Sequence, residues 1–424
     1  MAENYHMKSD GKKGLQDAQV TVVMVPLPAQ GHLNQLLHLS RLSSLYNIPV
    51  HYVGATTHIR QAKFRVHGFD PLADKTYIFM NFLHRFLKIP LQPVCCLVRH
   101  LLDANHRRVT VIFDSMMTWV VEDVPAILNA ECYCFHSISA FHLFSLFWEI
   151  KGKPLQDGTE LYKDILSLES CCTSEIMELT YNSSRIIDGL YLDLLAKECN
   201  GLNLQALGPF NPLLSEKNKN SNKHHKTLYW LGKQETNSVI HVSFGTSTSL
   251  SNKEIEELAI GLEKNADKGD VFSGEESRAQ IPEGYEERIK ERGIIVRDWA
   301  PQLDILAHTS TGGFMSHCGW NSCMESISMG VPIAAWPMHS DQPRNSQLVT
   351  KFLKIGLIVR NWARRDELVT SEIVENAVRT LMASPEGDEM RKRASELSNV
   401  VKQSVMDGGV NREEMDSFIA HITR

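Results

Sequence analysis

The stretch "FMSHCGWNSCMESISMGVPIAAWP", residues 314–336, contains the pattern that decides the fold. "GGFMSH" predicts a short strand, "CGWNSCMESISM" predicts a helix that ends at Gly330, and "GVPIAAWP" predicts a second strand. Strands that alternate with helices indicate a parallel α/β sheet. Sheets of this kind bind their ligands beyond the carboxyl ends of the strands.

The turn between the first strand and the helix has the features of an anion site. Free backbone N–H groups and the helix dipole favour negative charge there, and Gly319 lets a ligand approach the backbone closely. His317, Asn321 and Ser322 add side-chain donors. Because residues 299–343 include no Lys or Arg, a phosphate would be held by dipoles, amide, hydroxyl and imidazole groups. The turn is not a P-loop, which needs its Lys.

Four further positions near this turn suit a nucleotide sugar. Glu325 offers a carboxylate for two ribose hydroxyls, and Trp299 offers a face for a base, a contact worth on the order of 1–3 kcal/mol. Asp341 and Gln342 follow the second strand and suit sugar hydroxyls. Each also has an ordinary reading: Trp299 as core, Glu325 as a solvated helix residue, Asp341 as a helix cap. The ligand readings support one another because all four lie at strand ends or helix starts.

The alternation extends along most of the chain. The predicted strands are "QVTVVMVPLP", "IPVHYVGA", "RRVTVIFD", "ECYCFHS", "SVIHVSFG" and "GIIVRDW"; the helices include "GHLNQLLHLSRLSSLY" and "SNKEIEELAIGLEK", the latter capped by Ser251. The pattern stops at "GPFNPLLSEKNKNSNKHHKT", which reads as a linker. We therefore expect two Rossmann-like α/β domains facing a cleft: residues 1–210, a linker at 211–226, residues 227–405, and a final helix at 406–424 that packs back on the first domain.

Composition narrows the class of protein. The chain has 424 residues and a net charge of -6, which gives no electrostatic footprint for nucleic acid or an anionic membrane. Its nine cysteines are odd in number and form no C-x-x-C pair, so a reduced compartment is the simpler inference. The polar start and the absence of a long apolar run predict a soluble cytoplasmic protein without membrane insertion.

Two residues of the first domain suit proton transfer. His32, in "PLPAQGHLNQ", stands where the first strand gives way to a helix, and Asp114 ends the strand "VIFDS". Both would lie at the carboxyl edge of the sheet, facing the cleft. A histidine near neutral pKa suits removal of a proton from an alcohol, and a carboxylate on its other nitrogen fixes the tautomer. On its own, His32 also reads as an ordinary loop histidine.

The segment from Trp299 to Gln342 resembles the signature box of plant UDP-dependent glycosyltransferases, with "WAPQ", "HCGWNS", a glutamate and "DQ" at the box's positions. The resemblance implies a GT-B fold and a UDP-sugar donor without a metal. The donor contacts that it implies are Trp299, Ala300 and Gln302 for uracil and ribose, Glu325 for the ribose hydroxyls, His317, Trp320, Asn321, Ser322 and Thr246 for the diphosphate, and Asp341 and Gln342 for the sugar. It also implies that His32 and Asp114 are the catalytic pair.

The likeness covers nearly the whole chain and is greatest to the zeatin O-glucosyltransferase branch, in "THIRQAKFRVHGFDP", "FHSISAF" and "ALGPFNP". It implies an inverting, monomeric enzyme that transfers glucose, or xylose, to a small hydroxylated acceptor such as the cytokinin zeatin. Another plant metabolite, such as a flavonoid or other phenolic, and a silent UDP-binding relative stay open as alternatives. A nicotinamide-dependent oxidoreductase is disfavoured because no G-x-G-x-x-G turn occurs.

Three segments look shorter than in that family. No strand is readable between "LAIGLEK" and "GIIVRDW", so the second sheet is expected to lack a central strand and to expose pairing groups and apolar surface. The stretches after "FDPLADKTYIFMNF" and "CCTSEIMEL" also look abbreviated. These differences make the acceptor less certain than the donor.

Overall fold

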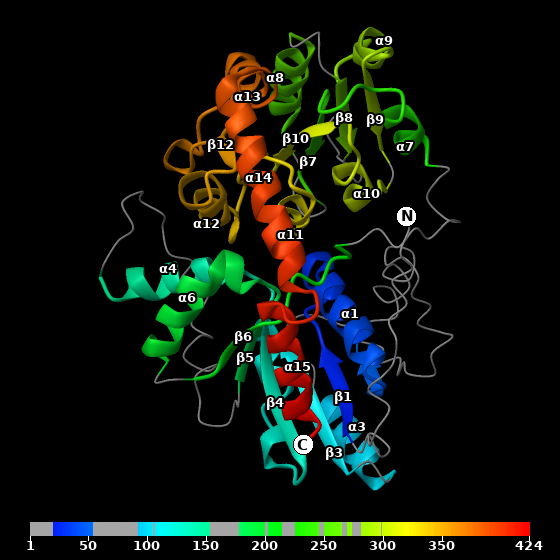
Figure 1. The fold of residues 1–424 in the computed structure, drawn as a ribbon, viewed down its shortest axis with the longest axis vertical. Helices are drawn as coiled ribbons and strands as arrows, with labels where there is room; N and C mark the ends of the chain where they lie inside the picture. The colour runs from blue at the N-terminus through cyan, green and yellow to red at the C-terminus, as the bar shows by residue number, and fades with distance from the viewer. Residues whose placement is uncertain are drawn as a thin grey trace.

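The chain forms two lobes, each built on a parallel sheet (Figure 1). The structure is a computed structural model, and it describes residues 20–53, 92–104, 107–152, 178–199, 202–213, 225–245, 250–264, 269–273, 281–297 and 299–424. Within these residues the strand order is β2-β1-β3-β4-β5-β6 in the first sheet and β12-β11-β10-β7-β8-β9 in the second. This is the doubly wound architecture predicted from the sequence.

The first lobe alternates strands with helices along the sequence. Its strands are β1 (Val20–Val25), β2 (Val50–Tyr52), β3 (Arg108–Asp114), β4 (Ala130–His136), β5 (Glu178–Tyr181) and β6 (Leu204–Ala206). Its helices are α1 (Gln30–Leu45), α3 (Gln92–Asp103), α4 (Ala140–Ile150) and α6 (Arg185–Glu198), with the 3₁₀ turns η1 (Ser115–Val120) and η2 (Val124–Ala126). The last helix of the chain, α15 (Val410–Ile422), also packs on this lobe.

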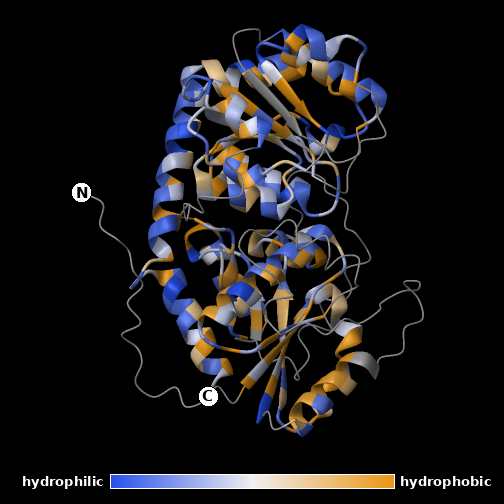
Figure 2. Cartoon of the chain, turned by 90° about the vertical axis from the view of Figure 1, so that its right-hand side faces the viewer, coloured by the Kyte–Doolittle hydropathy of each residue, from blue (hydrophilic) through white to orange (hydrophobic). Residues whose placement is uncertain are grey.

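Both faces of the first sheet are covered, which explains the unbroken apolar run of β1. Val23 and Val25 pack toward α3, α4 and α6, whereas Val22 and Met24 pack toward α1 and α15. Every residue of β1 is buried. Figure 2 shows the same distribution, with hydrophobic residues gathered on the strands inside each lobe. A strand buried on both faces places its carboxyl end at a fixed point of the molecule.

The second lobe has the same plan. Its strands are β7 (Val239–Ser243), β8 (Gly269–Ser273), β9 (Gly293–Val296), β10 (Thr311–Ser316), β11 (Ile333–Ala335) and β12 (Gly356–Ile358). Its helices are α7 (Lys226–Leu231), α8 (Asn252–Glu263), α9 (Tyr285–Ile289), α10 (Gln302–Leu306), α11 (Trp320–Met329), α12 (Gln342–Gln347), α13 (Ser371–Ala383) and α14 (Pro385–Ser404), with the short turns η3 (Leu348–Phe352) and η4 (Trp362–Arg364). The predicted cap of α8 is present, since Ser251 and Glu254 form a capping box.

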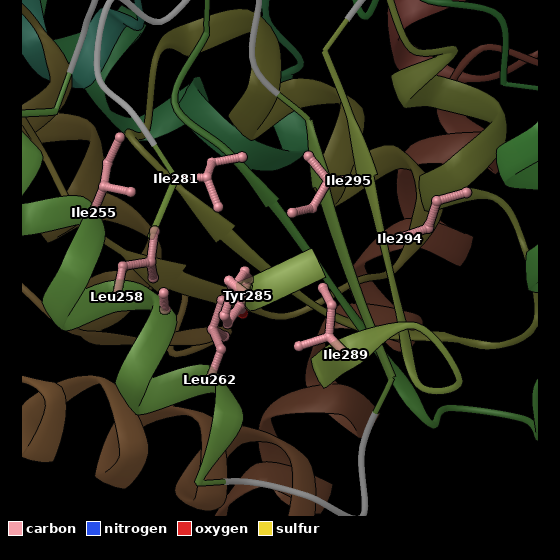
Figure 3. A pocket seen from close by; sticks show the side chains of 9 residues that line it. Ile255, Leu258, Leu262, Ile281, Tyr285, Ile289, Ile294 and Ile295 are labelled. Carbon is pink, nitrogen blue, oxygen red and sulfur yellow. The ribbon is translucent and has the colours of Figure 1, made fainter. Parts of the chain in front are cut away.

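The expected loss of a central strand is wrong. β8 occupies that place and pairs in parallel with β7 on one side and β9 on the other, so its pairing groups are used. Near it, apolar side chains of α8, α9 and β9, among them Leu258, Tyr285 and Ile295, line a small hollow (Figure 3). The two other segments expected to be short lie mostly outside the described residues.

The lobes meet through a packed interface. Phe141 of α4 and Ile187 of α6 belong to the same apolar cluster as Trp320 and Ile327 of α11. The 20-residue helix α14 leads from the second lobe to α15 on the first, as the orange and red helices of Figure 1 show. The relative placement of the two sheet edges is therefore supported by side-chain packing.

Candidate active site

Each lobe has its functional residues where the order of its sheet reverses. In the first sheet this point lies between β1 and β3, and in the second between β7 and β10. Helices α1 and α11 start just beyond β1 and β10, and these two starts meet: Asn321 Nδ2 donates a hydrogen bond of 2.7 Å to the carbonyl oxygen of Gly31. The two crevices that suit ligands in doubly wound sheets thus form one site.

The structure brings the proposed proton-transfer pair into contact. His32 Nδ1 lies 2.7 Å from Asp114 Oδ2, and the exposed fractions of the side chains are 26% and 0%. The other oxygen of Asp114 accepts the backbone N–H of Met116 at 3.0 Å. Ser137 Oγ also lies 2.7 Å from His32 Nδ1. Because a lone pair facing a carboxylate would be repelled, Nδ1 carries the proton and Nε2 is the basic nitrogen.

The surroundings of His32 favour its charged form. Burial alone would lower its pKa, but the charge and hydrogen bond of Asp114, with the charge of Asp341, outweigh this, and the pKa is raised above 6.5. His32 Nε2 has no hydrogen bond within the part of the chain that the structure describes. The ring is therefore arranged to accept a proton on Nε2 and to have the resulting charge stabilised at Nδ1.

The start of α11 has the geometry on which the predicted anion site depends. Gly319 is its N-cap, no side chain caps it, and the ring of His317 lies against it: a Cβ on Gly319 would be 2.5 Å from His317 Nε2. A Cβ on Gly245, at φ +74°, would be 2.8 Å from the same ring. Burial lowers the pKa of His317 to about 4, so the ring is neutral at pH 7. Glycine is needed at both positions for the ring to fit.

Two residues expected at the diphosphate also join the lobes. Trp320 is buried, and its indole N–H donates to the carbonyl oxygen of Asn182 at 2.8 Å. Its side chain is thereby committed to the interface, which leaves its backbone N–H, in the first turn of α11, for a ligand. Asn321 donates to Gly31, as described above. A bound diphosphate would therefore contact the same turn that fixes the approach of α1.

Gln302, Ser322 and Glu325 form one cluster. Gln302 Nε2 lies 2.7 Å from Glu325 Oε2 and 3.2 Å from Ser322 Oγ. Burial raises the pKa of Glu325 to about 7, against the opposing effect of the Gln302 hydrogen bond. Glu325 is thus partly buried and accepts a hydrogen bond from Gln302. This differs from the alternative prediction, in which Glu325 is a solvated residue on the surface of a helix.

Trp299 and Ala300 come shortly before Gln302 in the chain. Trp299 is partly exposed, and its ring lies at 89° to the ring of His225 at a centroid distance of 6.4 Å. Ala300 packs against the apolar cluster that includes Ile305. Thr246, expected at the diphosphate, lies outside the described residues.

Asp341 faces the first lobe from the start of α12. It is the residue before the helix, but its side chain caps no backbone N–H; Oδ2 instead accepts from Asn345 Nδ2 at 2.7 Å. Burial raises the pKa of Asp341, and Asn345, His32 and His339 oppose this effect. The charges of Asp341 and His32 shift each other's pKa, so the residue expected at the sugar lies close to the proton-transfer pair.

Gln342 is turned toward its own loop. Its Oε1 accepts the backbone N–H groups of Met338 and His339 at 2.8 and 3.1 Å, and its exposed fraction is 3%. The amide oxygen is therefore occupied, and the Nε2 donor, 3.5 Å from His339 Nδ1, is the group left for a sugar hydroxyl.

Sequence reasoning missed Ser137 and Asn345. Ser137 touches His32, and its carbonyl oxygen accepts from Gln35 Nε2 at 2.9 Å. Asn345 holds Asp341. Ser137 is the last residue of the predicted strand "ECYCFHS", so its place at a strand end was a signal; Asn345, inside a helix, gave none.

Among the described residues, no group of three His, Cys, Asp or Glu side chains is arranged as a metal site would be. No described helix is long and apolar enough to cross a bilayer. The seven cysteines within the described part of the chain form no disulfide with one another.

Fold and site together define a class: a two-lobed protein of the GT-B type, with a histidine–aspartate pair on one lobe and a helix start without a side-chain cap on the other. Residues 18–91 and 79–212 match the model "Glycosyltransferase, N-terminal domain", and residues 211–407 match "UDP-glucoronosyl and UDP-glucosyl transferase". The chain belongs to this family of UDP-dependent glycosyltransferases, and it uses a UDP-sugar donor.

Relatives match over nearly their full length. The chain is 46% identical to a zeatin O-glucosyltransferase of Phaseolus lunatus and 45% identical to a zeatin O-xylosyltransferase of Phaseolus vulgaris, covering 96% of this chain in both comparisons and 98% and 99% of the relatives. The first alignment spans 453 positions, more than the 424 residues here, so that relative has residues which this chain lacks.

Solved structures share the fold. A Phytolacca americana glycosyltransferase with UDP-2fluoro-glucose and pterostilbene superposes with a TM-score of 0.79 at 23% identity, covering 96% of this chain and 99% of that one. A Polygonum tinctorium glucosyltransferase has a TM-score of 0.80 at 21% identity, with 95% and 98% covered.

Proposed function

We propose that this enzyme transfers glucose from UDP-glucose to a hydroxyl of the cytokinin zeatin with inversion at the anomeric carbon. The observation that carries the proposal is the placement of the His32–Asp114 pair directly opposite the start of α11, joined by the Asn321–Gly31 hydrogen bond. The printed activities of the two Phaseolus relatives support zeatin as the acceptor.

The chemistry follows from the two sides of the site. His32 Nε2 removes the proton of the acceptor hydroxyl as its oxygen attacks the anomeric carbon, and Asp114 stabilises the imidazolium. UDP leaves from the opposite face. Its negative charge is met by the N–H groups at the start of α11 and by the neutral His317. Alignment of the two substrates in the cleft supplies much of the rate.

The choice of donor is the second part of the proposal. Gln342, the last residue of the box, supports glucose by its resemblance to enzymes that favour UDP-glucose, while a xylosyltransferase is almost as similar as a glucosyltransferase. The amide donor of Gln342 is the described group that would distinguish the sugars through the hydroxymethyl side of glucose.

The test is turnover of UDP-glucose and UDP-xylose with zeatin, a flavonol and a simple phenol, followed by chromatography of the products. We expect a zeatin O-glucoside with UDP-glucose. Product only from UDP-xylose, or only from phenolic acceptors, would replace the proposed substrates. UDP binding without any product would identify a silent relative. The monomeric state and cytoplasmic location stay predictions, to be tested by light scattering and by imaging of a tagged chain.

A further inference from the structure

Asn345 lies where three parts of the site meet. Its exposed fraction is 0%. Its Oδ1 accepts from Ser139 Oγ of the first lobe at 3.0 Å, and its Nδ2 donates to Cys318 O beside the anion turn at 3.0 Å and to Asp341 Oδ2 at 2.7 Å. One buried amide thus contacts the first lobe, the diphosphate turn and the residue expected at the sugar.

The contact on the first lobe leads directly to the base. Ser139 belongs to the short loop after β4 that also contains Ser137, whose Oγ is 2.7 Å from His32 Nδ1. Ser139 is fixed in turn as the cap of α4, where its oxygen accepts the N–H of His142 at 3.1 Å. The loop therefore contacts His32 through Ser137 and Asn345 through Ser139.

We propose that Asn345, with Ser139, is a positioning residue that sets the distance and orientation of Asp341 relative to His32. An amide suits this place because it accepts one hydrogen bond and donates two at fixed angles. Aspartate has no donor for Cys318 O, and an apolar residue leaves all three partners unpaired. The inference rests on the proposed function, in which Asp341 contacts the transferred sugar.

The charges around Asp341 support this role. Burial raises its pKa, whereas the hydrogen bond from Asn345 and the nearby His32 and His339 lower it; the thiol of Cys323 also lies within its field. Asp341 in turn raises the pKa of His32. Loss of Asn345 would favour a protonated Asp341, and the pKa of His32 would then fall.

The test compares Asn345→Ala with a control at the next residue. Arg344 forms a buried ion pair of 2.7 Å with Glu149 of α4, with exposed fractions of 5% and 6%, and this pair joins the same two helices. Arg344 reaches Asp341 only through its backbone N–H, which donates to the Asp341 carbonyl oxygen at 3.1 Å and is kept when the side chain is replaced. The double variant Glu149→Leu/Arg344→Met removes both charges and so leaves no buried charge alone.

For Asn345→Ala we expect kcat with UDP-glucose to fall on the order of 10- to 100-fold, the scale of a misplacement of about an ångström. The dissociation constant of UDP alone should stay within about twofold, because the turn at Cys318 keeps its own hydrogen bond from Cys318 N–H to Ser316 Oγ when Asn345 is replaced. The control should keep kcat within a few-fold. Equal losses in both variants, or weaker UDP binding in step with kcat, would show that Asn345 only joins the lobes.

Two further measurements keep the result clear. Asn345→Asp keeps the volume and the acceptor for Ser139, but it places a second carboxylate against Asp341; if Asn345→Ala fails to fold, this variant carries the test. NMR titration of the His32 imidazole needs no turnover. Its pKa should fall in Asn345→Ala and not in the control, whereas in Asn345→Asp the two neighbouring carboxyl groups keep at least one negative charge and the pKa should not fall. An unchanged pKa in Asn345→Ala overturns the inference, and so does a wild-type kcat in Asn345→Asp. If the His32 pKa changes as expected in the variants but the wild-type enzyme transfers no glucose, the inference about Asn345 stands and the proposed function is refuted.

Discussion

At the scale of single residues, the proton-transfer pair makes the plainest prediction. His32→Ala should lower kcat by about 10²–10⁴-fold, the usual contribution of a general base. Asp114→Asn should lower it less, because the base stays and only its tautomer and charge stabilisation are lost. Steady-state kinetics with calorimetry of UDP binding measures both effects. UDP affinity should barely move, since the nucleotide lies against the second lobe; near wild-type turnover in His32→Ala would exclude the ring as base.

The pH dependence of the rate follows from the raised pKa of His32. Below its pKa the ring is protonated and accepts no proton, so kcat/KM should fall as the pH falls through a value above 6.5. Asp114→Asn removes the largest effect that raises this pKa, and the acid limb should move to lower pH. A pH–rate profile of both enzymes decides the matter: an acid limb that stays in place in the variant argues against the pairing.

Glu325 predicts a second pH effect, confined to donor binding. Its pKa is raised to about 7, and ribose hydroxyls donate to the ionised carboxylate, so UDP affinity should rise as the pH passes upward through about 7. Glu325→Gln should bind UDP about tenfold more weakly or worse above that pH, as expected for a lost hydrogen bond to a charged group. Its affinity should also be flat between pH 6 and 8. Calorimetry across this range, with a thermal melt as the folding control, is the measurement.

The site residues that could be predicted from the sequence are those whose positions a local pattern of apolar residues marks. His32, Asp114 and the residues at the start of α11 stand at strand ends or helix starts, and these positions are readable from the run of apolar residues before them. Ser137 and Asn345 act through partners 105 and 206 positions away. Only the packing of strands and lobes makes such contacts, so sequence pattern alone does not reveal them.

At the scale of elements, the turn before α11 depends on a residue without a side chain. A Cβ on Gly319 would lie 2.5 Å from His317 Nε2, so Gly319→Ala should displace the ring from the anion site. We expect UDP to bind about tenfold more weakly or worse, since one hydrogen bond to a charged group contributes about 1.5–3 kcal/mol. Gly232→Ala, at an exposed position with φ −62° where the nearest atoms lie 3.5 Å from the added carbon, tests the effect of the substitution itself. Equal UDP affinity in both variants would mean that His317 takes no part.

β8 shows why an element was missed. Its sequence "GDVFS" begins with Gly and Asp, both of which are rare in strands, and it has only five residues. It forms because β7 and β9 offer pairing edges on both sides. The strands β1, β3 and β10 were predicted correctly because their apolar runs are intrinsic to the sequence. β5, β6 and β12 are three or four residues long and were not predicted either, and they too pair with neighbouring strands.

At the scale of the whole molecule, the charge of the leaving group is met by protein dipoles. We therefore predict that transfer does not depend on Mg²⁺, because the start of α11 and His317 supply the stabilisation that a metal would give. Activity should be unchanged after treatment with EDTA. The control is the same assay with added Mg²⁺; complete loss in EDTA, restored by the metal, would contradict the prediction.

The path of the chain has a mechanical consequence. The backbone passes from the first lobe to the second between β6 and α7, and it returns between α14 and α15, where α15 is anchored by buried Phe418 and Ile422. Beside these two connections, the lobes share the buried apolar cluster of Phe141, Trp320 and Ile327 and the hydrogen bond from Asn321 to Gly31. A shift of one lobe over the other would have to break these contacts. The register of His32 against the start of α11 is therefore set by buried packing as well as by the path of the chain.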